Sequence, residues 1–154
     1  MKFRNEYYFL SNMFPCNVTI DMAGVTIPET LRTVPSGNTT MTFPCSESAF
    51  QAAKCRNMKD MVQFQKLDGF AAKKAGQKVA LRPDWETVKV TVMANVVKAK
   101  FDQHDDIRAR LCSVTGEICE DNTWNDTFWG RCNGSGRNNL GKILMRIRDG
   151  YLAK

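Results

Sequence analysis

Three polar residues in one short segment have types and spacing that could do acid–base or nucleophilic chemistry. Glu47, Gln51 and Lys54 stand at positions i, i+4 and i+7, which places them on one stripe if the segment is helical. Because the residues between them are mostly apolar, the stripe could line a buried pocket. A carboxylate and an amine held away from water would have shifted pKa values suited to such work. The alternative is a solvent-facing stripe with a weak Glu–Lys contact.

A second segment combines aromatic rings with a carboxylate. Two tryptophans, Trp124 and Trp129, flank Asp126, and a glycine-rich stretch follows at 134–138. Aromatic rings can stack on nucleobases, and glycine-rich turns let backbone N–H groups approach phosphates. The alternative is a surface loop anchored by its tryptophans. A third tryptophan, Trp85, stands at an expected helix start. It could belong to a binding site, or it could only pack in the core.

Several other chemistries lack their signatures. The chain has no phosphate-binding G-x-x-x-x-G-K-[ST] loop, no G-x-S-x-G elbow and no H-E-x-x-H motif. His104 is the only histidine and lies in a charged segment, which disfavours cysteine–histidine catalysis. The six cysteines include no C-x-x-C pair, so we expect free thiols and no structural zinc site. We also expect no cofactor.

A small β element followed by a helical body is expected to position these residues. Alternating apolar residues over 17–27 predict a β-hairpin that turns at Ala23-Gly24, and the polar stretch 28–44 predicts a long exposed loop. Apolar periodicity and capping residues predict a series of helices. Their expected ranges are 47–57 (capped by Ser46), 61–67, 70–75, 84–101 (capped by Asp84), 105–113 and 139–149. The stretch 115–137 is expected to be a long loop that forms a site.

Length and composition indicate one globular domain. The chain has 154 residues, of which 43% are hydrophobic and 25% charged, which excludes collagen, coiled coil and wholesale disorder. No apolar run approaches the ~20 residues of a membrane span, and residues 1–6 do not resemble a secretory signal. We therefore expect a cytoplasmic protein without membrane contact. The net charge of +6 favours phosphate-bearing partners. The alternative is that these charges only solvate the surface.

An ordered set of motifs resembles the NADAR (YbiA-like) family between residues 5 and 148. The matching stretches are FLSN at 9–12, SESAFQAAK at 46–54, RPDW at 82–85, KFDQ at 100–103, NDTFWG at 125–130 and GRNNLGKILM at 136–145. The chain departs from the family pattern at Ser48, where histidine is usual, and in the length of the stretch 28–44. Both departures lie beside the expected pocket, so they bear on substrate choice more than on reaction class.

The resemblance implies a single compact α+β domain over 1–154, mostly helical with a small N-terminal β element. It also implies N-glycosidase activity on ribose-linked bases. Family members act on reactive riboflavin-pathway intermediates or remove ADP-ribose from guanine bases. The residues carried over as catalytic are Glu47, Lys54 and Asp126. Those carried over as substrate-binding are Asn12, Gln51, Trp85, Trp129, Gly130 and Asn138.

Cleavage of an N-glycosidic bond builds positive charge on the ribose C1′ and negative charge on the leaving base. Glu47 and Asp126 could divide two roles, stabilisation of the positive charge on C1′ and protonation of the leaving base. Alternatively, a desolvated Lys54 could attack the opened sugar aldehyde and form a Schiff base. Neither route needs a metal.

Two other function classes stay open at this point. One is a noncatalytic module that binds ADP-ribose or a nucleotide. The other is a basic nucleic-acid-binding protein, whose affinity would depend steeply on salt. Expected partners are therefore a small molecule, or an ADP-ribosylated or otherwise ribosylated base, which could belong to DNA or RNA.

Overall fold

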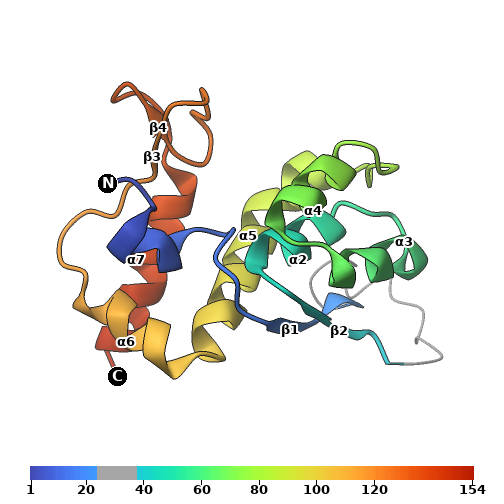
Figure 1. Ribbon diagram of the computed structural model, residues 1–154, viewed down its shortest axis with the longest axis horizontal. Coiled ribbons are helices and arrows are strands. Elements are labelled where there is room, and N and C mark those ends of the chain that lie inside the picture. Colours follow the sequence, from blue (N-terminus) through green and yellow to red (C-terminus); the bar gives the residue numbers. More distant parts are fainter. Residues whose placement is uncertain (24–37) are drawn as a thin grey trace. The chain divides into compact units, whose positions relative to one another are not determined.

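The computed structural model describes residues 1–23 and 38–154, and their contacts divide the chain into two compact units. The larger unit is formed by residues 12–103. The smaller one combines residues 1–11 with residues 104–154, so the two ends of the chain fold together. Both units are mainly helical (Figure 1). The predicted α+β class, mostly helical with a small N-terminal β element, is confirmed.

The sheet of the larger unit pairs two strands that are distant in sequence. Strand β1 (Val18–Asp21) runs antiparallel to β2 (Thr40–Phe43), with Val18 opposite Phe43. The predicted hairpin over 17–27 is not tested, because its second arm, like residues 28–37 of the predicted loop, lies outside the described residues. The loop prediction is wrong at 40–43, where threonines face outward and Met41 and Phe43 are buried.

Helices form the rest of the larger unit. They are α2 (Ser46–Ala52), α3 (Met58–Val62), the 3-10 helix η3 (Gln63–Lys66), α4 (Gly69–Gly76) and α5 (Trp85–Asp102). Every residue of α2 is buried, because this short helix contacts α3, α4, α5 and the sheet. Figure 1 shows α2 and α4 side by side with α5 next to them. Any polar side chain on α2 therefore lies inside the unit.

Helix α2 is shorter than the sequence predicts. Its N-cap is Cys45, not Ser46. The Ser46 hydroxyl donates to Asn12 instead of capping the helix, and the backbone carbonyl of Asn12 also accepts the N–H of Glu47. The helix ends at Ala52 instead of 57. The chain then turns, and Cys55 forms an isolated bridge with Leu81.

Of the N-cap residues of α4 and α5, the sequence predicts only Asp84. Asp68 accepts a hydrogen bond from Ala71 N at 2.8 Å and caps α4, which runs over 69–76 where 70–75 is predicted. Asp84 is the N-cap residue of α5, yet its side chain makes no capping bond. Its two oxygens instead accept from Arg82 Nε at 2.6 Å and Nη2 at 2.9 Å.

The smaller unit packs two helices around a folded loop. Its elements are η1 (Asn5–Leu10), α6 (Asp105–Ser113), β3 (Asp121–Asn122), β4 (Arg131–Cys132) and α7 (Asn139–Leu152). Helices α6 and α7 contact each other, and β3 pairs in parallel with β4. Within the described residues, no helix is long and apolar enough to cross a membrane.

Candidate functional site

Glu47 and Gln51 form a buried hydrogen-bonded pair on α2. Gln51 Nε2 donates to Glu47 Oε1 at 2.8 Å. The exposed fractions of the two residues are 8% and 4%, so the solvent-facing alternative is wrong for both. The Gln51 Oε1 atom is buried without a hydrogen-bond partner in the described residues. A buried polar atom in this state costs free energy, so the pair is not optimised for stability alone.

Lys54 extends this pair into a row of three polar groups. It lies in the turn after α2, not on the helix, and its backbone N–H donates to Gln51 O at 3.1 Å. Partial burial lowers the pKa of its amine, Glu47 opposes that shift, and Lys73 and Lys89 add to it. A lowered pKa gives more of the neutral amine, which is the nucleophilic form.

Trp85 forms the wall beside Lys54. The Lys54 Nζ lies 5.9 Å from the centre of the Trp85 ring, within the range of a cation–π contact. The ring also packs on Phe50 with centroids 5.1 Å apart, and Trp85 is only 6% exposed. Core packing is therefore the larger part of its structural role. A backbone hydrogen bond holds the segment before Trp85 against Lys54, since the Arg82 N–H donates to Lys54 O at 2.9 Å.

Asn12 fixes the start of α2 next to Glu47. Its backbone carbonyl accepts from Glu47 N at 3.0 Å, and its Oδ1 accepts from Ser46 Oγ at 2.9 Å. Its Nδ2 donates to Met93 Sδ at 3.4 Å. Asn12 thus acts on Glu47 through the backbone.

Ser48, where the family usually has histidine, faces the core. It is fully buried, its hydroxyl donates to Leu67 O, and the same oxygen lies 3.3 Å from Cys45 Sγ. No titratable group replaces the usual histidine at this position.

In the smaller unit, Asp126 organises its own loop. Its Oδ1 accepts from the backbone N–H groups of Phe128 at 3.1 Å and Trp129 at 2.9 Å. Its backbone N–H and carbonyl are both bonded to the side-chain amide of Asn122. One carboxylate oxygen therefore has a structural role, and the predicted catalytic role of Asp126 stays a prediction.

Trp129 and Gly130 follow directly on this turn. Trp129 is half-buried and meets Phe128 edge to face, with ring centroids 4.7 Å apart. Gly130 is buried, and a Cβ atom there would lie 2.3 Å from Glu120 O. Only glycine fits this close approach of two backbone segments, which accounts for Gly130 without a substrate contact.

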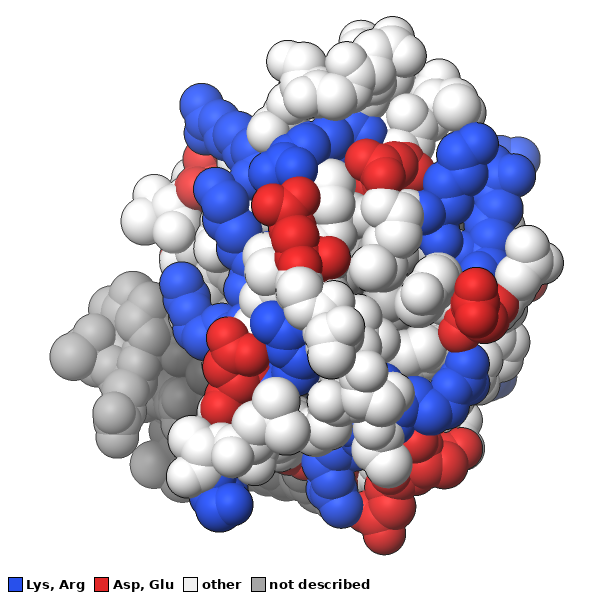
Figure 2. Space-filling view, turned by 90° about the vertical axis from the view of Figure 1, so that its left-hand side faces the viewer, with Lys and Arg blue, Asp and Glu red and all other residues white. Residues whose placement is uncertain are grey.

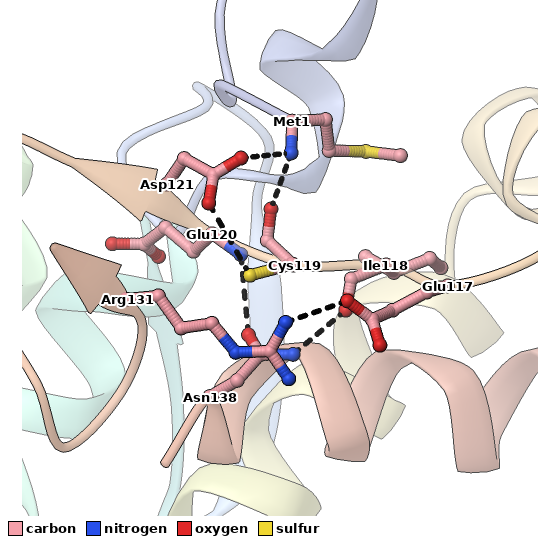
Figure 3. A network of polar contacts seen from close by, with 8 residues as sticks. All are labelled: Met1, Glu117, Ile118, Cys119, Glu120, Asp121, Arg131 and Asn138. Atoms are coloured by element: carbon pink, nitrogen blue, oxygen red, sulfur yellow. Dashed lines mark hydrogen bonds and ion pairs between the residues drawn. The ribbon is translucent and has the colours of Figure 1, made fainter. Parts of the chain in front are cut away.

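Asn138 joins the segment before β3 to the start of α7 (Figure 3). Its Nδ2 donates to Ile118 O at 2.9 Å and its Oδ1 accepts from Glu120 N at 3.2 Å. Its backbone has φ of 53°, in the left-handed region, which asparagine tolerates better than most residues. Because both amide atoms bind backbone, Asn138 has the geometry of a positioning residue.

The predicted site residues thus fall into two sets that we describe separately. The first set belongs to the larger unit and consists of close neighbours: Asn12, Glu47, Gln51, Lys54 and Trp85. Asp126, Trp129, Gly130 and Asn138 belong to the smaller one. Their assignment as a site stays a proposal.

Sequence reasoning missed two buried cations of the larger unit. Arg82 is 7% exposed, and its Nη1 is buried without a partner in the described residues. Lys100 is fully buried. The sequence does contain a signal for Lys100, because it continues the apolar spacing of Val92 and Val96 along α5 by a further four residues.

Surface charge is mixed on the face drawn in Figure 2. Basic side chains there are interspersed with acidic ones. Carboxylates therefore divide the basic surface of this face. Among the described residues, no group of three or more His, Cys, Asp or Glu side chains is arranged to hold a metal ion.

A mostly helical α+β fold that buries a carboxylate and an amide next to a partly buried amine of lowered pKa indicates an enzyme, not a structural protein. The model of the NADAR domain family matches residues 1–151, and the chain belongs to this family. It is 36% identical over 112 residues to a protein named N-glycosidase YbiA from Escherichia coli (strain K12), which covers 70% of each chain.

A second relative covers more of this chain. A protein named riboflavin biosynthesis protein VVA0006, from Vibrio vulnificus (strain YJ016), is 31% identical over 150 residues, which are 92% of this chain and 35% of that protein. Among solved structures, the NMR structure of the E. coli protein YbiA matches with a TM-score of 0.75 and 27% identity, over 99% of this chain and 84% of that one. The predicted family, fold and enzyme class, an N-glycosidase, are confirmed.

Proposed function

We propose that this protein hydrolyses the bond between a base and ribose in a ribosylamino intermediate of the riboflavin pathway, with ADP-ribose linked to a guanine base as the second candidate substrate. The observation that carries the proposal is the buried Glu47–Gln51 pair with the partly buried Lys54 next to it, beside Trp85. This row puts a carboxylate and an amine of lowered pKa in one partly desolvated environment, which suits cleavage of a glycosidic bond.

Glu47 is proposed to act on the sugar. As the bond breaks, positive charge develops on C1′, and a carboxylate nearby stabilises it more strongly when water is excluded. The Gln51 amide donates to Glu47 Oε1, which fixes the orientation of the carboxylate. Asn12 holds the backbone of the same residue. Asn12 and Gln51 are thus proposed as positioning residues.

Lys54 offers a covalent route. Its neutral amine can attack C1′ of the opened sugar and form a Schiff base, while the base leaves with a proton; water then releases the sugar and restores the amine. Burial lowers the pKa of Lys54, which increases the neutral fraction near pH 7. The test below separates this route from direct hydrolysis, because only the Schiff base can be reduced to a stable adduct.

Asp126 and Trp129, which belong to the smaller unit, keep the catalytic and substrate-binding roles that the family resemblance implies. Trp129 is proposed to stack on a ring of the substrate. The role of Trp129 is tested by its own variant in the Discussion.

The substrate choice rests on the name of a relative. The Vibrio relative, which matches 92% of this chain, is called a riboflavin biosynthesis protein. We therefore place the ribosylamino pyrimidine intermediates first. The position usually held by histidine is a buried serine here, so a substrate contact made by that histidine would be lost.

The decisive experiment mixes the protein with each candidate substrate and follows free base and free sugar by mass spectrometry. The proposal predicts release from a ribosylamino pyrimidine or from guanine-linked ADP-ribose, and loss of release in Glu47→Gln. Glu6→Gln, which changes an exposed glutamate of η1, is the matched control and should retain full turnover. Sodium borohydride added during turnover should leave a sugar adduct on Lys54 if the covalent route operates.

Two results would replace the proposal. Tight binding of ADP-ribose with no bond cleavage in any candidate would make the protein a binding module. Binding to arbitrary DNA that weakens steeply with salt, again without cleavage, would make it a nucleic-acid-binding protein.

A further inference from the structure

Two cysteines of the larger unit flank a buried lysine that the proposed mechanism does not use. The Lys100 side chain is fully buried. Its Nζ lies 5.6 Å from the centre of the Phe14 ring and 5.1 Å from that of Phe101. Burial lowers the pKa of this amine to about 8, and the thiols of Cys16 and Cys45 are the neighbours that act in the opposite direction. Phe14, the ring over which the Lys100 amine lies, stands two residues before Cys16 in the chain.

The backbone brings these two cysteines together. Cys16 lies two residues before Val18 on β1, and Cys45 two residues after Phe43 on β2. Both cysteines lie just outside the paired strands, whose register ends at Val18 opposite Phe43. Cys16 N donates to Pro44 O at 3.1 Å. This bond joins the backbone of Cys16 to the residue directly before Cys45, so the two cysteines are backbone neighbours, as a disulfide requires.

The two thiols differ in exposure in a way that suits sequential oxidation. Cys16 is partly exposed, whereas Cys45 is only 2% exposed. A small oxidant can therefore reach Cys16 first, and Cys45 is placed behind it. A cationic amine next to a thiol favours the thiolate, which is the reactive form. Lys100 supplies that cation from the core side.

We propose that Cys16 and Cys45 form an oxidisable thiol pair that closes to a disulfide when the protein meets hydrogen peroxide. The Cys16 thiolate attacks one peroxide oxygen, which gives a sulfenic acid and, after protonation, one water. The Cys45 thiol then attacks that sulfur, and the sulfenic hydroxyl leaves as a second water. Two thiols are oxidised by two electrons and one peroxide molecule is reduced.

The pair is connected to the candidate site through α2. Cys45 is the N-cap residue of α2, and its sulfur lies 3.3 Å from Ser48 Oγ. Glu47 stands between these two residues in the first turn. A disulfide at Cys45 would constrain the residue that starts α2, so oxidation should affect the start of the helix. An effect on turnover rests on the proposed function, whereas the chemistry of the thiols does not.

The experiment measures thiols directly in the full-length reduced protein. Titration under denaturing conditions should find about six thiols before oxidation, as expected for a chain with six cysteines, and about four after a brief exposure to peroxide. Nonreducing tryptic mapping should then show peptide 5–32 joined to peptide 33–54, each of which contains one cysteine. The half-buried Cys112 and Cys132 serve as internal controls and should keep their thiols.

Variants and a denatured reference complete the test. In Cys45→Ser, peroxide should leave a sulfenic acid on Cys16 that dimedone traps, with no joined peptide. In denaturant, where Lys100 is no longer adjacent, Cys16 should react several-fold more slowly than in the folded chain. The proposal is overturned if Cys112 or Cys132 is oxidised as fast as Cys16, or if Cys16 is oxidised in the native protein and no Cys16–Cys45 link forms.

Discussion

The Lys54 ammonium lies 5.9 Å from the centre of the Trp85 ring, in the turn that follows the buried Glu47–Gln51 pair. The aromatic face attracts the cation, and the carboxylate of Glu47 raises the Lys54 pKa, but burial outweighs these effects and the pKa is lowered. The resulting pKa sets the fraction of Lys54 that is present as the nucleophilic neutral amine. The pH dependence of turnover should therefore follow the titration of Lys54.

The first prediction concerns this pH dependence. If neutral Lys54 is the nucleophile, kcat/KM should rise with pH, and the midpoint should lie below 10.5, the ordinary value for lysine, because burial lowers the pKa. Lys54→Met should abolish that rise. The matched change Lys59→Met, at an exposed lysine of α3, should leave the profile as it is. A rise that persists in Lys54→Met would assign it to another group.

The second prediction tests the positioning role of Gln51. A Cβ atom at Gly76 would lie 1.9 Å from Gln51 Oε1. Because Gln51 is buried and bonded to Glu47, Gly76→Ala should displace its amide and reduce turnover. Overpacking of this kind typically costs about 1–3 kcal/mol of stability, measured by urea unfolding. Gly150→Ala, where a Cβ meets nothing within 4 Å, should not lower either quantity. Unchanged turnover in folded Gly76→Ala would remove the role of Gln51.

The third prediction concerns Trp129. Stacking of a base on an aromatic ring is worth roughly 1–3 kcal/mol, so Trp129→Ala should weaken ligand binding by about tenfold or more in a protein that still folds. Trp124→Ala is the control, because Trp124 is 56% exposed. Isothermal titration with ADP-ribose and with a ribosylated pyrimidine measures both. If Trp129→Ala is destabilised yet binds normally once folded, Trp129 only packs against Phe128.

The sequence predicts the long helices well and the sheet poorly, for physical reasons. Helices α6 and α7 start at their predicted residues, 105 and 139. The acidic first turn of α6 and the regular apolar stripe of α7 are both local signals. Strand β2 has only Met41 and Phe43 as buried residues among threonines, and its partner lies about twenty residues earlier. Such a pairing has no local signature.

In the candidate site, too, the features with local sequence signals are predicted and those that depend on distant segments are not. The i, i+4 spacing of Glu47 and Gln51 predicts their shared stripe, and the hydrogen bond between them confirms it. Their burial depends on how α4 and α5 pack on α2, which spacing alone leaves open. The early end of α2 at Ala52 and the anchoring of its start by Asn12 come from contacts between distant segments.

The fourth prediction concerns the buried Lys100. Its pKa is lowered to about 8 from 10.5, so above pH 8 the folded chain has lost a proton that the unfolded chain still binds. The free energy of unfolding should therefore rise with pH between 8 and 10.5, by on the order of 3 kcal/mol from this residue. The neighbouring thiols of Cys16 and Cys45 oppose the shift and are present in every variant compared.

Urea unfolding at pH 8 and pH 10 measures this rise. Lys100→Met should remove it, because methionine fills a similar volume without a charge. Lys98→Met, at a half-exposed lysine of the same helix that pairs with Asp102, should keep it. Equal pH dependence in Lys100→Met and in the unaltered chain would refute the assignment.

The central claim is that Glu47 acts in the chemical step, and turnover of Glu47→Gln tests it most directly. Glutamine keeps the size and polarity of the side chain but cannot carry the negative charge. Acid–base and charge-stabilising groups typically contribute ~10²–10⁴-fold, so kcat on the cleaved ribosylated substrate should fall by about that factor, with ligand affinity within a few-fold. Near-normal turnover in a folded Glu47→Gln protein would contradict the account and leave Asp126 or Lys54 as the leading catalytic candidate.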